Sequence, residues 1–159
     1  LGSDALRYWL ARYPADSPLN LDGEKLRSRT NDNPVFYVQY AHARTHNVAA
    51  NAAQAGITTE GFDPATLTHA TETQLIARIT QFPQMVALAA ELREPHRVAR
   101  YLEELAADFH RWYDNCRVIP LRGEEVEPVH ASRLVLNNAA GQVLRNGLEL
   151  LGVSAPQRM

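Results

Sequence analysis

Residues 33–55 read NPVFYVQYAHARTHNVAANAAQA, and this stretch decides the fold because it predicts one long helix that ends near Gly56. The Asn33 side chain can accept hydrogen bonds from free N–H groups of the first turn, and Pro34 suits the first helical position. At about 100° per residue, the helix has two unlike faces. The small apolar face carries Val35, Val38, His42, Ala49 and Ala53. The polar face carries Tyr37, Tyr40, Arg44, Asn47 and Asn51.

The polar face of this helix allows two interpretations. Tyrosine rings and a guanidinium can stack on unpaired bases, so the face could contact single-stranded RNA. Alternatively, Tyr37 and Tyr40 cover the edge of a core while Arg44 is solvated, as is common for these residue types. The pattern by itself favours the second interpretation.

Composition limits the classes of protein to which the chain can belong. It has 159 residues, is 45% hydrophobic and carries a net charge of −2, which predicts about one domain with a true core. Its single cysteine excludes an internal disulfide framework and a multi-cysteine zinc site, and a reducing cytoplasm is the expected compartment. No run of transmembrane length and no signal peptide is visible, and because the chain starts at Leu1 we expect a piece of a longer protein. The net charge argues against general polyanion binding but permits a local basic patch.

Helical periodicity continues through most of the chain. Helices are expected at 3–13, 34–56, 71–81, 85–92, 95–116 and 129–151, with a short element near 23–29 and loops at 57–70 and 117–128. The clearest apolar stripe is formed by Val98, Leu102, Leu105, Phe109, Trp112 and Cys116. No convincing strand is present, so the sequence predicts an all-α helical bundle.

Candidate catalytic and metal-binding residues are few. His42 and His46 have the i, i+4 spacing of metal ligands, but no third ligand is marked, so a core histidine is favoured over a zinc site. A metal enzyme using this pair remains an alternative. Cys116 and His110 fall on different helix faces and do not form a plausible nucleophile and base. We therefore predict no catalytic residue, no metal and no cofactor for this chain.

A basic set opens the long helix at 95–116 and continues along it. Its members are Arg93, His96, Arg97, Arg100, Arg111 and Arg117. One interpretation is a solvated face partly paired with Glu103, Glu104 and Asp108. The other is a surface that contacts RNA phosphates and positions the RNA without reading its sequence.

Four ordered motifs closely resemble the C-terminal region of arginyl-tRNA synthetases. They are DNPVFYVQYAHAR at 32–44, EPH at 94–96 with FHRWYDNCRV at 109–118, ASRL at 131–134, and NGLELLGV at 146–153 ahead of APQRM at 155–159. The third is close to the sequence that gives the DALR anticodon-binding domain its name. Residues 3–8 and 16–19 resemble the end of the catalytic domain of that family.

The resemblance implies a domain plan and an activity. Residues 1–32 would be the tail of a catalytic domain with a connector, and residues 33–159 a helical bundle of the class I synthetase anticodon-binding type. The parent would be an arginine–tRNA ligase that uses ATP and Mg²⁺ to join arginine to its tRNA. The HIGH and KMSKS signatures of that family are not found in this chain, so the fragment alone should be inactive. Its partners would be arginine tRNA and the upstream catalytic domain, in a cytoplasmic monomer without membrane contact.

The resemblance also implies which residues contact the anticodon, whose central cytosine the family chiefly reads. The matching positions are Tyr37, Tyr40, Arg44, Tyr113 and Met159, together with the less uniform Arg117. The alternative function is a helical protein–protein docking module without RNA binding, whose tyrosine face contacts a partner domain.

Overall fold

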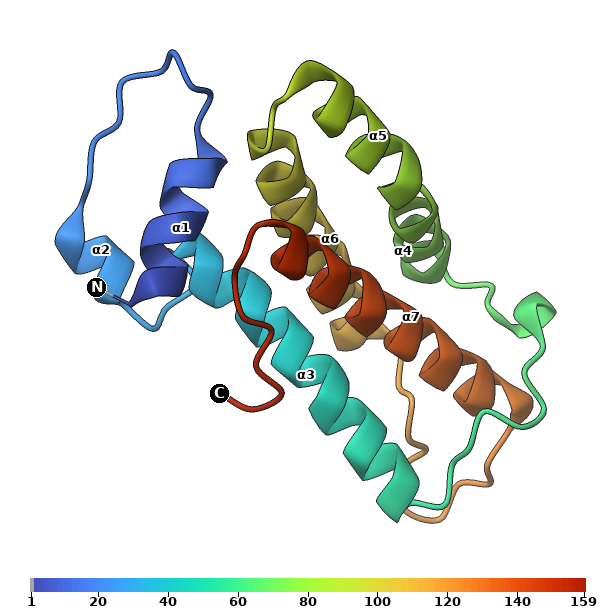
Figure 1. Cartoon of the computed structure of the whole chain (residues 1–159). Coiled ribbons are helices and arrows are strands. Elements are labelled where there is room, and N and C mark those ends of the chain that lie inside the picture. The colour runs from blue at the N-terminus through green and yellow to red at the C-terminus, as the bar shows by residue number, and fades with distance from the viewer. Residues whose placement is uncertain (1) are drawn as a thin grey trace.

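The computed structural model describes residues 2–159, which form helices joined by loops, without a β-strand in that range (Figure 1). In chain order the elements are α1 (Ser3–Arg12), α2 (Gly23–Arg27), α3 (Pro34–Gln54), the 3₁₀ turn η1 (Pro64–Thr66), α4 (Ala70–Thr80), α5 (Phe82–Leu92), α6 (His96–Asn115) and α7 (Pro128–Leu150). The predicted all-α class is confirmed. The long predicted helices end within about two residues of the observed bounds, as expected where helix ends fray.

The centre of the bundle is formed by α3, α6 and α7, which pack against one another. The helices α4 and α5 extend the bundle beside α6, while α1 and α2 lie at the opposite end (Figure 1). The predicted apolar stripe of α6 is buried along its whole length, from Val98 to Cys116. Gly147 lets α7 approach α6 closely, since a Cβ atom there would lie 2.5 Å from Leu102 Cδ2.

Two details of the predicted helix starts are wrong. Asn33 stands at the N-cap of α3 but makes no capping hydrogen bond. Its Nδ2 instead donates to the carbonyl oxygens of Leu26 (3.3 Å) and Ser28 (2.8 Å), so it ties the preceding segment to the helix. Ser3, the predicted cap of the first helix, is its first helical residue, and Gly2 takes the cap position.

The core face of α3 is also rotated slightly from the prediction. Val35, Val38 and His42 are buried as expected. Ala53 is exposed, and Val48 and Ala52 are buried in the last turns instead. The buried face of α3 is therefore broader than the small-residue pattern predicted.

The first helix packs onto the bundle. Tyr8 is fully buried, and its hydroxyl donates to the Ala99 carbonyl and to Glu103, both at 3.1 Å. Arg12 forms an ion pair with the same Glu103 at 2.7 Å. Residues of α1 thus contribute side chains to the core of the bundle, and the domain boundary at residue 33 stays a prediction.

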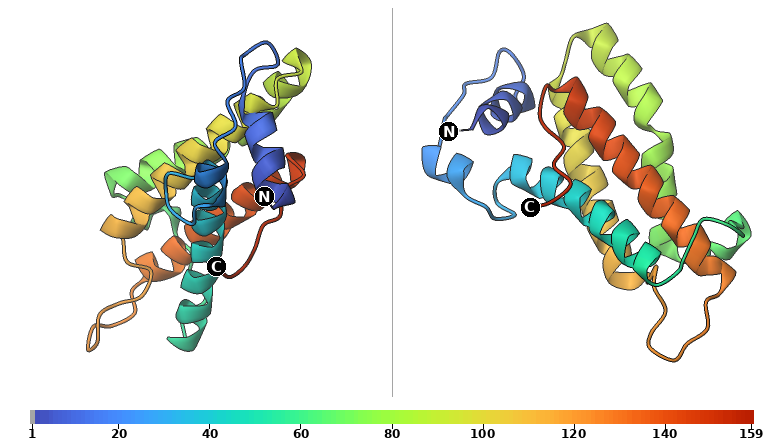
Figure 2. Two further views of the ribbon diagram at one scale, coloured as in Figure 1. Left: turned by 90° about the vertical axis from the view of Figure 1, so that its left-hand side faces the viewer. Right: turned by 60° about the horizontal axis from the view of Figure 1, so that its bottom comes forward.

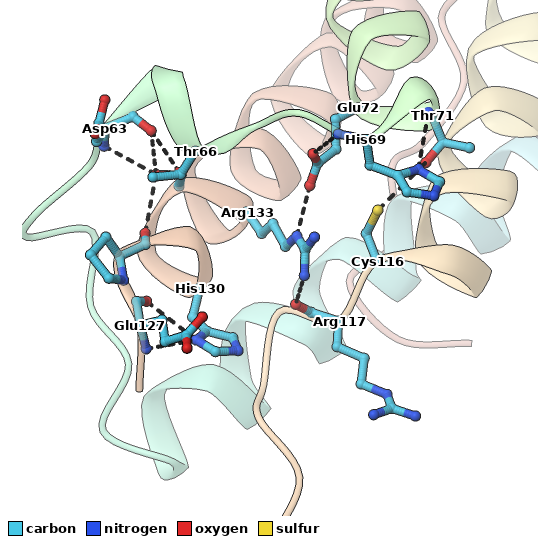
Figure 3. Close-up of polar contacts among 12 residues, drawn as sticks. Asp63, Thr66, His69, Thr71, Glu72, Cys116, Arg117, Glu127, His130 and Arg133 are labelled. Atoms are coloured by element: carbon cyan, nitrogen blue, oxygen red, sulfur yellow. Dashed lines mark hydrogen bonds and ion pairs between the residues drawn. The ribbon is translucent and has the colours of Figure 1, made fainter. Parts of the chain in front are cut away.

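The ASRL motif at 131–134 has a structural role near the start of α7 (Figure 3). Arg133 Nε pairs with fully buried Glu72 at 2.7 Å, and Arg133 Nη1 donates to the Arg117 carbonyl at 3.0 Å. Ser132 Oγ donates to the Asp63 carbonyl at 2.9 Å and accepts from Thr66 Oγ1 at 3.0 Å. The motif therefore holds α4, η1 and the segment that follows α6 against α7.

The loop that joins α6 to α7 extends beyond the ends of the helices in both views of Figure 2.

None of the helices within residues 2–159 combines the length and the apolar character that crossing a membrane requires.

Candidate nucleic-acid interface

Four of the predicted site residues meet where α3 packs against α6. Tyr37, Tyr40 and Arg44 come from one side of α3, because they are separated by three and four residues. Tyr113 comes from the last turns of α6. The Arg44 guanidinium carbon lies 4.8 Å from the Tyr40 ring centroid and 4.5 Å from that of Tyr113. Arg44 is therefore held between two tyrosine rings, a cation–π arrangement.

Hydrogen bonds fix the orientation of this guanidinium. Arg44 Nη2 donates to Tyr40 Oη at 2.8 Å, and Nη1 donates to His110 Nδ1 at 3.1 Å. Because arginine only donates, His110 Nδ1 must carry a lone pair, and the imidazole proton is on Nε2. Nε2 is buried and has no hydrogen-bond partner among the described residues.

The charge state of His110 follows from its surroundings. Burial, and next the positive charge of Arg44, lower the pKa of His110 to about 4. The imidazole is thus neutral at pH 7 and can accept from Arg44 without repelling it. Its ring also lies 5.1 Å from that of Tyr37 and 5.7 Å from that of Tyr40. The sequence interpretation considered His110 only as a base for Cys116 and did not predict it as a member of this site. The signal that could have placed it here is its spacing of three residues from Tyr113, which puts both on one face of the helix.

Phe36 is a second missed member of the site. Its ring stacks on that of Tyr40, with centroids 6.0 Å apart and planes within 6°. The signal was again helical spacing, since residues four apart share a face. We call Phe36, Tyr37, Tyr40, Arg44 and Tyr113 the aromatic strip.

Parts of the aromatic strip are open to solvent. Tyr113 is 42% exposed, and Tyr40 and Tyr37 are partly exposed. Burial raises the pKa of Tyr37, so its phenol is neutral at pH 7 and can donate a hydrogen bond. The strip thus offers ring faces, a cation and a hydroxyl on one surface.

Arg117 lies beside Tyr113 of the aromatic strip. The two residues line one groove of about 390 Å³, together with Asn51 and Val118. The Arg117 carbonyl is held by Arg133, whereas its side chain points away from that network (Figure 3). The structure therefore places Arg117 next to the strip, through the groove that it shares with Tyr113.

Met159 is positioned by the segment that follows α7. Gln39 Nε2 donates to the Ser154 carbonyl, and His42 Nδ1 donates to the Pro156 carbonyl, both at 2.9 Å. Met159 is 56% exposed and lines the same groove as Phe36. The predicted residue therefore stands at the Phe36 end of the aromatic strip.

The histidine pair of α3 has an ordinary structural environment. His42 Nδ1 bears the proton that it donates to Pro156, so His42 Nε2 accepts from His46 Nε2 at 3.3 Å. Burial lowers the pKa of His42. Across residues 2–159, three His, Cys, Asp or Glu side chains do not gather into a group able to hold a metal ion.

Cys116 is buried at the end of α6 and its Sγ lies 3.5 Å from Thr71 Oγ1. Burial raises the pKa of its thiol, which disfavours the thiolate that a nucleophile requires. His110 faces Arg44 rather than Cys116. The pair therefore has neither the contact nor the ionisation of a catalytic dyad.

The basic set on α6 is partly paired, in a pattern that differs from the predicted one. Arg97 pairs with Glu94, and Arg111 with Asp108 at 3.4 Å. The other two predicted partners are engaged elsewhere. Glu103 pairs with Arg12 and Glu104 with Arg78.

Comparison with known proteins places this chain in a family. The family model described as "DALR anticodon binding domain" matches residues 38–159. An arginine–tRNA ligase of Renibacterium salmoninarum is 60% identical over 159 residues, which cover 100% of this chain and 29% of that protein. An arginine–tRNA ligase of Kineococcus radiotolerans is 62% identical over 160 residues, with the same coverage. The chain thus spans less than a third of the length of these relatives.

A solved structure shares the fold. The Thermus thermophilus arginyl-tRNA synthetase superposes with a TM-score of 0.79 at 30% identity, over 98% of this chain and 26% of that one. This likeness confirms the predicted type of helical bundle.

Proposed function

Because the chain belongs to the DALR anticodon binding domain family, we propose that it holds the anticodon stem-loop of arginine tRNA. The observation that carries this proposal is the aromatic strip, in which Arg44 is held between Tyr40 and partly exposed Tyr113 beside an open groove. Sequence-specific RNA recognition targets unstacked loop bases, which stack on aromatic rings and guanidinium planes. The strip provides both kinds of surface.

The parent protein is proposed to be an arginine–tRNA ligase that arginylates its tRNA with ATP and Mg²⁺, in the cytoplasm and as a monomer. The names and identities of the relatives support this activity. The residues of the present chain are proposed to bind and orient tRNA next to the catalytic domain. They are not proposed to hold ATP or Mg²⁺, and the chain alone should not arginylate.

The proposed binding mode assigns two roles to the site residues. Ring faces of the tyrosines stack on splayed loop bases, and each such stack contributes about 1–3 kcal/mol. Arg44 supplies positive charge near the backbone, which positions the RNA. Two of its N–H groups are already used by Tyr40 and His110, so the guanidinium is oriented before RNA arrives. Such preorganisation reduces the entropic cost of binding.

Binding of two stem-loops tests the proposal. One has the arginine anticodon and the other has its central cytosine replaced by uracil. We expect the first to bind, and the second to bind more weakly. Equal affinity for both would overturn specific readout. Absence of binding to either would overturn the RNA function and favour the protein–protein docking alternative, which predicts a tight complex with the upstream region of the parent.

A further inference from the structure

A second groove lies next to the aromatic strip, between the segment that precedes α3, the start of α1 and the C-terminal segment. Its volume is about 570 Å³. Three of its lining residues are the arginines Arg27, Arg29 and Arg158, and two are Phe36 and Met159. We propose that this groove binds the sugar–phosphate backbone of the RNA whose bases stack on the aromatic strip. The inference rests on the function proposed above and adds a site formed largely outside α3 and α6.

Positive charge exceeds negative charge in this groove, which is lined by three arginines and one aspartate. Arg27, Arg29 and Arg158 are exposed, and none of them forms an ion pair within the described part of the chain. Its acidic lining residue, Asp4, accepts hydrogen bonds from Ser154 and Gln39 and faces the C-terminal segment. On a chain with a net charge of −2, three unpaired arginines around one groove form a local positive patch. Such a patch attracts phosphates even where the whole protein does not.

The groove is continuous with the aromatic strip. Phe36 lines the groove and stacks on Tyr40, whose hydroxyl accepts from Arg44. From Phe36 to Arg44 the distance along the helix axis is about 12 Å at a rise of 1.5 Å per residue. A single strand whose bases stack on the strip would therefore bring its backbone to the groove within a short distance.

The walls of the groove are held in place by hydrogen bonds rather than by the arginines themselves. Asn33 Nδ2 fixes the carbonyls of Leu26 and Ser28, on either side of Arg27. On the opposite wall, Gln39 and His42 hold the Ser154 and Pro156 carbonyls ahead of Arg158. The three guanidinium groups are thus carried on a defined frame. Interpreting Asn33 as a helix cap does not predict these bonds to Leu26 and Ser28, so it does not predict the groove either.

Salt dependence of RNA binding distinguishes phosphate contacts from base contacts. Each phosphate contact to single-stranded nucleic acid contributes about 0.7 to the slope of log affinity against log salt. Replacing all three arginines with alanine should lower that slope by about 2. The affinity deficit of the triple variant should therefore shrink by about 20-fold between about 50 and 200 mM salt. Discrimination against the uracil-substituted loop should persist, because phosphate contacts position the RNA without specifying its sequence.

The experiment uses the arginine anticodon stem-loop with wild type, the triple alanine variant, the matching triple lysine variant and Arg122→Ala. Arg122 is an exposed arginine in the loop between α6 and α7, so it controls for the loss of a charge elsewhere. The lysine variant keeps the charge and should keep most of the slope. Melting curves should be unchanged, since the three side chains are exposed.

A triple alanine variant with the salt slope of Arg122→Ala would overturn the groove proposal while wild-type binding keeps the anticodon function. A lysine variant that loses the slope as alanine does would also overturn it, because the effect would then not be one of charge. Wild-type protein that binds no stem-loop would instead remove the function on which the inference rests.

Discussion

Tyr113 and Phe109 offer a direct test of which aromatic side chains serve binding and which serve folding. They lie four residues apart on α6, and their ring centroids are 6.4 Å apart. Phe109 is fully buried, whereas Tyr113 is 42% exposed and covers Arg44. Alanine at position 113 should therefore impair RNA binding and leave the fold intact, and alanine at 109 should do the reverse.

The expected magnitudes differ enough to be measured. Loss of one base–aromatic stack in Tyr113→Ala costs about 1–3 kcal/mol of binding, or about 5- to 150-fold in affinity. Its effect on stability should be about 0.5–1 kcal/mol, the value of an exposed cation–π contact. Phe109→Ala should lower the free energy of unfolding by about 3–5 kcal/mol, because a large cavity opens in the core.

The assay combines filter binding of the arginine anticodon stem-loop with thermal melting of each variant. Tyr113→Phe is the matched control, since it keeps the ring face and should bind within a few-fold of wild type. The reasoning would be refuted if Tyr113→Ala bound as tightly as wild type. It would also be refuted if Tyr113→Ala lost as much melting temperature as Phe109→Ala, because the ring would then be part of the core.

Two further expectations concern stability. Because the pKa of His110 falls to about 4 in the folded protein, the unfolded chain takes up the proton first as the pH drops below about 6.5; the melting temperature should decline from there towards pH 4. This contribution should be missing in His110→Phe, and an unchanged pH profile of that variant would contradict it. Arg133→Ala leaves the carboxylate of fully buried Glu72 unpaired and should cost about 3–5 kcal/mol in denaturant unfolding. Arg145→Ala, which breaks an exposed ion pair, should cost about 1 kcal/mol or less; equal losses would contradict the assigned role of Arg133.

The positions of the helices could be predicted because local chemistry sets them. Pro34 starts α3, and the period of apolar residues on α6 marks a face that is buried throughout. The start of α5 was predicted at 85 and lies at Phe82, because Pro83 occupies the first turn of that helix and not the break before it. Asn33 shows where this local reasoning stops. Its side chain can bond to its own helix or to the carbonyls of Leu26 and Ser28, and the choice depends on how the preceding segment folds back.

In the predicted site, too, the features within one helix could be predicted and those that depend on how two helices pack could not. Tyr37, Tyr40 and Arg44 could be placed on one face because they belong to a single helix. The contribution of Tyr113 came from the resemblance, and His110 was missed, since both depend on the register between α3 and α6. Helical spacing by itself shows that His110 and Tyr113 share a face but not which helix that face contacts.

The ASRL motif, which is close to the sequence that gives the DALR domain its name, lies away from the proposed RNA surface. Arg133 ties α7 to Glu72 of α4 and to the Arg117 carbonyl just after α6 (Figure 3). That carbonyl belongs to the segment that lines the groove beside Tyr113. Arg133, which is not proposed to contact RNA, therefore sets the position of Arg117, which is. Asn33 has the same role at the groove lined by Arg27, Arg29 and Arg158, so both ends of the aromatic strip depend on a side chain that holds backbone carbonyls: Arg133 at one end and Asn33 at the other. Substitutions of Asn33 or Arg133 should therefore alter tRNA binding through the geometry of the site, even where the tyrosines and arginines proposed to contact RNA are unchanged.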